Sequence, residues 1–443
     1  MTTFPEVLLA LRDRWEHRMV PDLDRINHLL DALGSPHRAY PSVHITGTNG
    51  KTSTARMVDS LLTAFGLSTG RLTSPHLETV TERICTAGIP LTEQQFAAAY
   101  DDVAPAVELV DAAHADRVTY FELVTAMGFA ALADAPVDVA VVEVGLEGRW
   151  DATNVLQAPV VAVLEVARDH TDLLGDDLGA IAAETAGIIH TGSSVVLAQQ
   201  PPAALGPLLA RAAEVGSGVA REGVDFGVLQ REVAVGGQRL ALQGIGGVYD
   251  DLNLSLHGAH QAHNAACALA AVESFFGAGP GKQLDVDAVR EGFAAADSPG
   301  RLELVRSGPA VLLDGAHNPA GARALVAALE EAFSFQRLVG VVGVLADKDA
   351  RGLLEALEPV LESVVCTASS SPRSLSADAL AAIAVDVFGA DRVEAVPALD
   401  DALVAAVEVV EDDPDLVGAR GGGVLVTGSL LTVGEARALL RRG

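Results

Sequence analysis

The segment "VHITGTNGKTST", residues 43–54, constrains the fold more than any other part of the sequence. It places a glycine-rich loop between the apolar run "YPSVHITG", which predicts a buried strand, and "TSTARMVDSLLTAFG", which has helical periodicity. Backbone N–H groups of such a loop and the N-terminus of the following helix attract phosphate oxygens. The loop is shorter than a standard phosphate-binding loop, because only Thr48 and Asn49 separate Gly47 from Gly50. We therefore expect a phosphate-binding loop of an unusual type.

Two side chains directly after the loop have the chemistry that a nucleoside triphosphate requires. We expect Lys51 to neutralise the β- and γ-phosphates and the hydroxyl of Thr52 to ligate Mg²⁺. Lysine is rare in this chain, where the only others are Lys282 and Lys348. The alternative is an ordinary glycine-rich turn, which the Gly-Lys-Thr sequence before a helix disfavours.

Composition limits the classes of partner. The net charge of −29 argues against binding nucleic acid through broad basic patches. No apolar run is long enough to span a bilayer, and the N-terminal segment lacks the pattern of a signal peptide. Three cysteines without paired spacing (Cys85, Cys267 and Cys366) indicate reduced thiols. We expect a cytoplasmic protein that binds small molecules, with no nucleic acid and no membrane as partner.

Strand-like and helix-like segments alternate along the 443 residues, which are too many for one ordinary core. Three further apolar runs predict parallel strands: 137–145, 158–166 and 193–199. Alternation with glycines over 228–256 predicts an attached antiparallel element. A Ser-Pro-Gly turn then interrupts the pattern, which restarts after it. We predict an α/β protein in which residues 1–298 form a P-loop-like parallel-sheet ATPase domain and residues 299–443 form a smaller Rossmann-like α/β domain.

Motifs spread over the whole chain resemble the folylpolyglutamate synthase and dihydrofolate synthase family of the Mur ligase superfamily. The loop "GTNGKTST" is the first of them. The others follow in the family's order: "TSPHLETVTERI" (73–84), "TYFELVTAMGF" (119–129), "VVEVGLEGRWDATN" (141–154), "DHTDLLG" (169–175), "HQAHNAACALAAVE" (260–273), "SPGRLE" (298–303), "LLDGAHNPAGARAL" (312–325), "SPR" (371–373) and "VLVTGSLLTVGE" (424–435). The ordered set, rather than any single motif, carries the resemblance.

The resemblance implies an ATP-dependent ligase, commonly monomeric, with a Mur-ligase-type domain for ATP and the pterin and a C-terminal glutamate-ligase domain. Such an enzyme joins the amine of L-glutamate to a carboxylate of dihydropteroate or a reduced folate. ATP first converts that carboxylate to an acyl phosphate, because a carboxylate oxygen is a poor leaving group. The site must hold two anions together, so metal ions and cationic side chains have to offset their repulsion.

The resemblance also implies which residues hold ATP and Mg²⁺. Phosphate contacts are implied for Gly47, Thr48, Asn49, Gly50, Lys51 and Thr52. Ligands to Mg²⁺ are implied at Thr52, Ser74, Glu143 and His170, and catalytic roles at Lys51, Glu143, His170 and Arg301. A lone carboxylate at the end of an apolar strand is costly, which supports a ligand role for Glu143. The interpretation of His170 depends on the motif around it.

The remaining nucleotide contacts are implied on both domains, so that closure belongs to the reaction cycle. Arg301 would reach the phosphates, Asp314 the ribose and His317 the nucleotide side, while Asn264 on the larger domain would contact the base. A strand-end turn followed by a helix cap is an equally good explanation of the sequence around Asp314.

The acceptor pterin is implied to lie against two short segments, at Thr119, Tyr120, Phe121, Glu122, Trp150, Asp151 and Ala152. Flat apolar faces suit a planar pterin, and the carboxylate of Asp151 could pair with ring N–H groups. The alternative is that these aromatic side chains fill the core.

Three residues depart from the family pattern near the metal motifs. Thr185 stands where the family carries a lysine that becomes carbamylated and bridges to a second metal. Glu147 replaces a glycine, and Arg168 replaces an uncharged residue. One hypothesis is that Arg168, held by Glu147, takes the place of a second cation, so that one Mg²⁺ suffices.

The departures leave two other functions open. One is a divergent paralogue that ligates a different acceptor or amine. The other is an inactive nucleotide-binding homologue, which the intact loop and the other metal and nucleotide motifs argue against.

Overall fold

The computed structural model describes residues 2–14, 21–146, 148–169, 175–411 and 421–442. It contains three sheets. The largest has eight strands in the order β4-β3-β2-β5-β1-β6-β7-β8. Their bounds are β1 Ser42–Thr46, β2 Thr69–Leu72, β3 Ile84–Thr86, β4 Ile89–Pro90, β5 Val139–Glu143, β6 Val160–Val163, β7 Ser194–Leu197 and β8 Gly218–Arg221. The six strands from β2 to β8 in this order are parallel, whereas β3 and β4 pair antiparallel at one edge.

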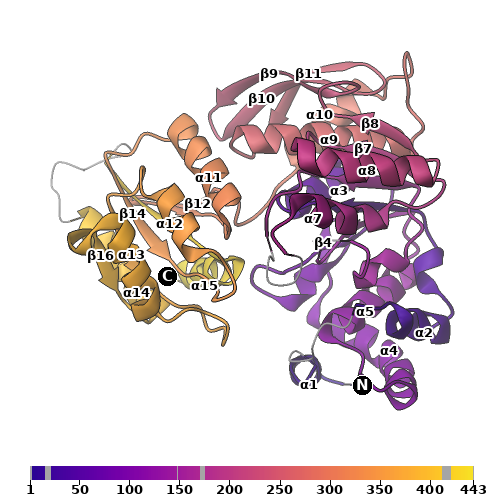
Figure 1. Ribbon diagram of the computed structural model, residues 1–443, viewed down its shortest axis with the longest axis horizontal. Coiled ribbons are helices and arrows are strands. Elements are labelled where there is room, and N and C mark those ends of the chain that lie inside the picture. The colour runs from indigo at the N-terminus through magenta and orange to yellow at the C-terminus, as the bar shows by residue number, and fades with distance from the viewer. Residues whose placement is uncertain (1, 15–20, 147, 170–174, 412–420, 443) are drawn as a thin grey trace.

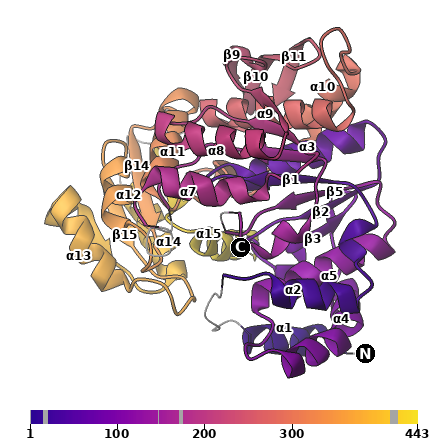
Figure 2. The same ribbon diagram turned by 45° about the vertical axis from the view of Figure 1, so that its right-hand side comes forward.

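Helices cover both faces of this sheet, which explains why its central strands β1 and β5 are buried along their whole length. Val43 and Ile45 of β1 face a core that includes residues of α3 (Lys51–Ala64), α9 (Ala259–Phe275) and α10 (Val286–Ala295). On the other face, Ala140 and Val142 of β5 pack with α1 (Phe4–Arg12), α2 (Asp24–Ala32), α4 (Glu93–Ala113) and α5 (Tyr120–Asp134). Further along that face lie α7 (Leu178–Thr185) and α8 (Pro202–Glu214). Figure 2 shows α3, α9 and α10 on one side of the sheet and α1, α2, α4 and α5 on the other.

A three-stranded antiparallel sheet of β9 (Gly227–Ala234), β10 (Gly237–Gln243) and β11 (Val248–Leu254) is attached to this layer beside α9 and α10 (Figure 1). The prediction of an antiparallel element over 228–256 is therefore confirmed. Short 3-10 helices occur at η1 Pro36–Arg38, η2 Val80–Arg83, η3 Ala152–Val155, η4 Ala186–Ile188 and η5 Ala390–Arg392.

The C-terminal part is a second layered α/β unit beside the first (Figure 1). Its sheet has the order β12-β13-β17-β14-β15-β16, in which only β12 runs antiparallel. The strands are β12 Glu303–Ser307, β13 Ala310–Leu313, β14 Arg337–Val342, β15 Ser363–Cys366, β16 Val393–Ala395 and β17 Gly422–Thr427. The helices are α11 Pro319–Ala332, α12 Ala350–Leu357, α13 Ala377–Phe388, α14 Leu399–Glu411 and α15 Leu430–Arg442. Separate apolar cores lie on its two faces.

The predicted fold class, a parallel-sheet α/β domain followed by a smaller α/β domain, is confirmed. The boundary near residue 299 falls between the end of α10 and the start of β12 and remains a prediction. None of the helices in the described part of the chain combines the length and apolar character that a membrane span requires.

Candidate active site

Parallel strands bring their carboxyl ends to one edge of the sheet, and ligands of open α/β sheets bind outside that edge. Here the loop at 47–50 follows β1, Ser74 follows β2, and Glu143 is the last residue of β5. These three segments are far apart in sequence, but β2, β5 and β1 are neighbours in the sheet. The order of the strands therefore gathers the predicted residues at one place.

The short loop has conformations and contacts that require glycine. Gly47 and Gly50 have φ angles of 132° and 82°. A Cβ atom at Gly47 would lie 2.7 Å from the Cβ of Leu164, and one at Gly50 would lie 2.5 Å from Oδ1 of Asn264. Between them, the amide of Thr48 donates to the carbonyl of Glu165 at 3.0 Å. The loop is thus fixed against the segment after β6.

Lys51 lies at the start of α3, and its ammonium folds back over the loop. The Nζ atom donates to the carbonyls of Gly47 at 2.6 Å and Thr48 at 3.2 Å. The lysine itself is half-buried. A flexible cation at the N-terminus of a helix is well placed to meet phosphate oxygens.

Glu143 is only 3% exposed and is surrounded by donors. The hydroxyl of Thr52 donates to its two carboxylate oxygens at 2.9 and 3.0 Å, and the amide of Ser74 donates at 3.2 Å. Burial raises the pKa of Glu143, while the charge of Lys51 and the bond from Thr52 act in the opposite direction. The structure therefore brings together three of the four residues predicted to ligate Mg²⁺.

The donor set can be tested against the metal. It is made of oxygen atoms from hydroxyl and carboxylate groups, which is the preference of Mg²⁺. Among the described residues, no group of three or more His, Cys, Asp and Glu side chains is placed to hold a metal ion. Magnesium commonly uses one or two carboxylates together with water and substrate phosphates, so the residues fit such an ion. His170, the fourth predicted ligand, lies outside the described residues.

A cavity of about 660 Å³ opens over this cluster and is lined by both domains. Its volume lies in the range of small-molecule sites. The larger domain contributes the loop, Glu143 and Asn264, and the C-terminal domain contributes Arg301, Asp314 and His317. Every predicted nucleotide contact outside Gly47 therefore lines the same space.

The C-terminal residues are held by their own turns. Both carboxylate oxygens of Asp314 accept backbone N–H bonds of 2.8 Å, from Leu302 and Ala316. Burial raises the pKa of Asp314, and the guanidinium of Arg301 opposes the shift. These bonds agree with the alternative explanation of Asp314 as part of a strand-end turn, although the residue also lines the cavity. Nδ1 of His317 lies 2.9 Å from the carbonyl of Gly315.

Most of the predicted pterin residues have structural partners. Thr119 and Glu122 form a capping box at the start of α5, and Glu122 also pairs with the buried Arg25 at 3.1 Å. The ring of Tyr120 lies under the guanidinium of Arg83 at 5.3 Å. Phe121 differs, because it lines a small cavity of about 20 Å³ that also reaches Glu143.

The second predicted pterin segment is divided between surface and core. Trp150 is 43% exposed and Ala152 is buried. Asp151 is buried, with its oxygens accepting from the amide of Thr153 at 2.9 Å and the amide of Leu146 at 2.8 Å. Burial raises the pKa of this carboxyl. Its bonds cap the 3-10 helix η3, and its role toward a pterin remains a prediction.

Two of the three unusual residues can be located. Thr185 is 1% exposed, and its hydroxyl donates to the carbonyl of Ile181 at 3.0 Å. Arg168 is exposed, and its Nε donates to the carbonyl of Asp176 at 3.1 Å. Neither lines the cavity. Glu147 lies outside the described residues. The position of Arg168, away from the cavity lining, gives no support to the hypothesis that it replaces a second cation.

Sequence reasoning missed a polar cluster that joins the two domains beside the cavity. Asp169 accepts from Nζ of Lys348 at 2.6 Å and from Nδ2 of Asn318 at 3.1 Å, and Asn318 also donates to Asn49 of the loop at 3.1 Å. The side chains of Asp169 and Lys348 are 7% and 8% exposed. The scarcity of lysine was the one signal in the sequence that pointed to Lys348.

Comparison with known proteins places this arrangement in a class. Residues 45–272 match the Mur ligase middle domain, and residues 300–430 match the Mur ligase glutamate ligase domain. The chain therefore has the domains of a Mur-type ligase.

Individual relatives narrow the class. The chain is 53% identical to the dihydrofolate synthase/folylpolyglutamate synthase of Mycobacterium tuberculosis, over 98% of this chain and 93% of that one. It is 30% identical to the Bacillus subtilis protein of the same name, over 99% and 100%. The chain belongs to the folylpolyglutamate synthase and dihydrofolate synthase family.

Solved structures agree with this assignment. M. tuberculosis folylpolyglutamate synthase complexed with ADP superposes with a TM-score of 0.95 at 52% identity, covering 99% of this chain and 98% of that one. Escherichia coli FolC in complex with DHPP and ADP gives a TM-score of 0.86 at 30% identity, covering 100% and 99%.

Proposed function

We propose that this chain is an ATP-dependent ligase that adds L-glutamate to dihydropteroate or to a reduced folate through an acyl phosphate. The observation that carries the proposal is the shared cavity. In it, Lys51 and the cluster of Thr52, Ser74 and Glu143 on the larger domain face Arg301 and His317 of the smaller one. A site divided in this way can hold ATP on one domain and complete itself when the other closes.

The first step joins the acceptor to phosphate. A carboxylate oxygen of the acceptor attacks the γ-phosphorus, and the bond from that phosphorus to the β,γ-bridging oxygen breaks to release ADP. Backbone N–H groups of the loop, with Lys51, offset charge on the β- and γ-phosphates, and Arg301 does so from the opposite domain. Thr52, Ser74 and Glu143 would hold Mg²⁺, which when bound neutralises phosphate charge and orients the triphosphate.

The second step forms the amide. The neutral amine of glutamate attacks the acyl carbon, and the tetrahedral intermediate expels inorganic phosphate while the nitrogen loses a proton to water. We assign ATP and the pterin to residues 1–298 and glutamate to residues 299–443. Phe121, which lines a small cavity together with Glu143, is the proposed aromatic contact of the pterin. We further propose that the enzyme acts as a monomer in the cytoplasm and uses Mg²⁺.

Measurement of ADP formation tests the proposal. Purified protein with ATP and Mg²⁺ should form ADP only when glutamate and an acceptor are both present, with dihydropteroate and tetrahydrofolate assayed separately. If protein that still binds ADP shows no turnover with dihydropteroate and none with tetrahydrofolate, the proposal is contradicted. That result would favour a different acceptor or amine.

A further inference from the structure

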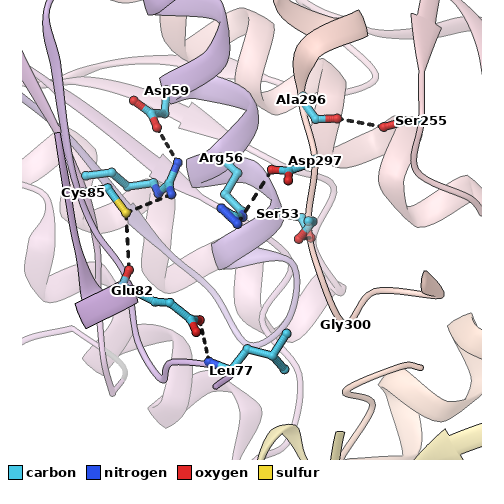
Figure 3. Close-up of polar contacts among 12 residues, drawn as sticks. Ser53, Arg56, Asp59, Leu77, Glu82, Cys85, Ser255, Ala296, Asp297 and Gly300 are labelled. Atoms are coloured by element: carbon cyan, nitrogen blue, oxygen red, sulfur yellow. Dashed lines mark hydrogen bonds and ion pairs between the residues drawn. The ribbon is translucent and has the colours of Figure 1, made fainter. Parts of the chain in front are cut away.

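The segment between the two domains is held by the same helix that carries the phosphate-binding residues. This linker, residues 296–300, joins α10 to the turn that bears Arg301. Figure 3 shows Ser53 and Arg56 of α3 directed toward it. Arg56 lies 3.7 Å from the carboxylate of Asp297, and the hydroxyl of Ser53 lies 3.1 Å from that of Ser298. The first turns of α3 therefore contact both the cavity and the linker.

Ser53 is the centre of a buried chain of hydrogen bonds. It is 1% exposed, and Ser298 and Gln261 are also buried. Nε2 of Gln261 donates to the hydroxyl of Ser53 at 3.3 Å, and Nδ2 of Asn264 donates to Oε1 of Gln261 at 3.1 Å. A serine hydroxyl can accept one hydrogen bond and take part in a second as donor or acceptor. Ser53 can therefore bond to Gln261 and Ser298 at the same time. The chain runs from the predicted base contact, Asn264, to the linker.

The linker in turn fixes the position of Arg301. The amide of Arg301 donates to the carbonyl of Ser298 at 3.2 Å, and the amide of Gly315 donates to the carbonyl of Gly300 at 2.9 Å. Gly300 has a φ of 71°, and a Cβ atom there would lie 3.1 Å from a methyl group of Leu77. A shift of Ser298 would therefore move the turn from which the arginine reaches the cavity.

We propose that Ser53 is a positioning residue that couples the phosphate-binding helix to Arg301 through Ser298. Thr52 and Ser53 are consecutive in the first turn of α3. Thr52 is the predicted metal ligand, and Ser53 holds the linker through Ser298. The inference rests on the proposed function only for its kinetic consequence, since the contacts themselves belong to the fold.

Ser60 offers a matched control. It lies on the same helix, and its hydroxyl donates to the carbonyl of Gly292 at 2.7 Å. That bond joins α3 to α10 within the larger domain and does not reach the linker. Removing either hydroxyl deletes one oxygen from α3, but only the change at Ser53 should affect Arg301.

The kinetic test compares Ser53→Ala, Ser298→Ala, Ser60→Ala and the double variants Ser53→Ala/Ser298→Ala and Ser53→Ala/Ser60→Ala. We expect Ser53→Ala and Ser298→Ala each to lower kcat about tenfold with little change in the KM for ATP, because misplacement of a charge-stabilising group acts on the transition state. The Ser53/Ser298 double variant should be no worse than either single variant, whereas effects at Ser53 and Ser60 should add. Wild-type kcat in both single variants, or additive losses at Ser53 and Ser298, would overturn the inference.

Hydrogen exchange provides a second readout that does not need turnover. Ser53→Ala should speed exchange of a peptide covering residues 296–302, and Ser60→Ala should leave that peptide unchanged. If wild-type protein forms no ADP with the acceptors above, the proposed function fails, and the exchange result still decides the coupling. Equal exchange of this peptide in Ser53→Ala and wild-type protein would contradict it.

Discussion

The hydroxyl oxygen of Thr52 lies 2.9 Å and 3.0 Å from the two carboxylate oxygens of Glu143, although 91 positions separate the residues in sequence. Thr52 lies in the first turn of α3, the helix that follows β1, and Glu143 ends β5, the neighbouring parallel strand. This pair places the phosphate-binding loop beside a buried acid.

Replacing Lys51 with alanine should abolish turnover without unfolding the protein. The ammonium bonds only to carbonyls of its own loop among the contacts that are described, so the core does not need it. We expect kcat to fall by roughly 10² to 10³, the usual cost of losing a charge-stabilising group. Steady-state ADP formation measures this, with the exposed Lys282→Ala as control. Near-wild-type turnover in folded Lys51→Ala protein would refute the loop assignment.

Replacing Glu143 with glutamine should reduce activity about 100-fold, because the amide keeps the shape but loses the charge that a metal ion requires. Raising the Mg²⁺ concentration should restore part of the loss. Titration of kcat against Mg²⁺ for the variant and the wild-type protein checks this. A defect that is indifferent to Mg²⁺ would count against the ligand role.

The same substitution should stabilise the fold when nucleotide and Mg²⁺ are absent. Burial raises the pKa of Glu143 above its ordinary value of 4.5, so the folded state binds a proton there more readily than the unfolded chain. Stability from this site is therefore lost as the pH rises from that value through the raised pKa. Glutamine does not titrate, and the Tm of Glu143→Gln minus that of wild type should grow over this range. A Tm difference that shrinks with rising pH would contradict this prediction.

Phe121→Ala should weaken acceptor binding and leave ATP binding intact. Its ring lines the small cavity next to Glu143 and does not line the large one. Loss of an aromatic face is worth about 1 kcal/mol, so we expect the KM for the pterin acceptor to rise about fivefold. The KM for ATP serves as the internal control. Equal changes in both constants would indicate a structural rather than a binding role.

Lys348→Met should loosen the contact between the domains. The buried Asp169 would lose its 2.6 Å partner, at a cost of about 2 kcal/mol. Arg373 is the matched control, because its ion pair with Asp347 is exposed and such pairs contribute little. Thermal unfolding should show a lower Tm for Lys348→Met and almost no change for Arg373→Met. Equal Tm values for the two variants would show that the interdomain pair adds no stability.

Much of this arrangement could be predicted from the sequence because parallel strands end at a common edge. The resemblance implied that Thr52, Ser74 and Glu143 share a metal site, and these residues do meet at the edge where β1, β2 and β5 end. The contacts between domains were not predictable in the same way. Asp169 and Lys348 are 179 residues apart and lie in different domains, so no periodicity relates them.

The sequence pattern also did not predict which groups the charged side chains bond to. The sequence around Arg168 suggested a pairing at the metal site, but a long side chain on an exposed segment can turn to a local acceptor, here the carbonyl of Asp176. Similarly, nothing in the sequence indicated that the carboxylate of Glu122 caps α5 and pairs with Arg25, which is distant in sequence. The role of Glu122 toward a pterin remains a prediction.

The most direct test of the account follows oxygen from the acceptor carboxylate. If that carboxylate attacks the γ-phosphorus, one of its oxygens must leave with phosphate when glutamate forms the amide. Dihydropteroate or tetrahydrofolate labelled with ¹⁸O in the carboxylate should give inorganic phosphate that carries one ¹⁸O per turnover, measured by mass spectrometry. Unlabelled phosphate released together with a glutamylated product would contradict the acyl-phosphate route.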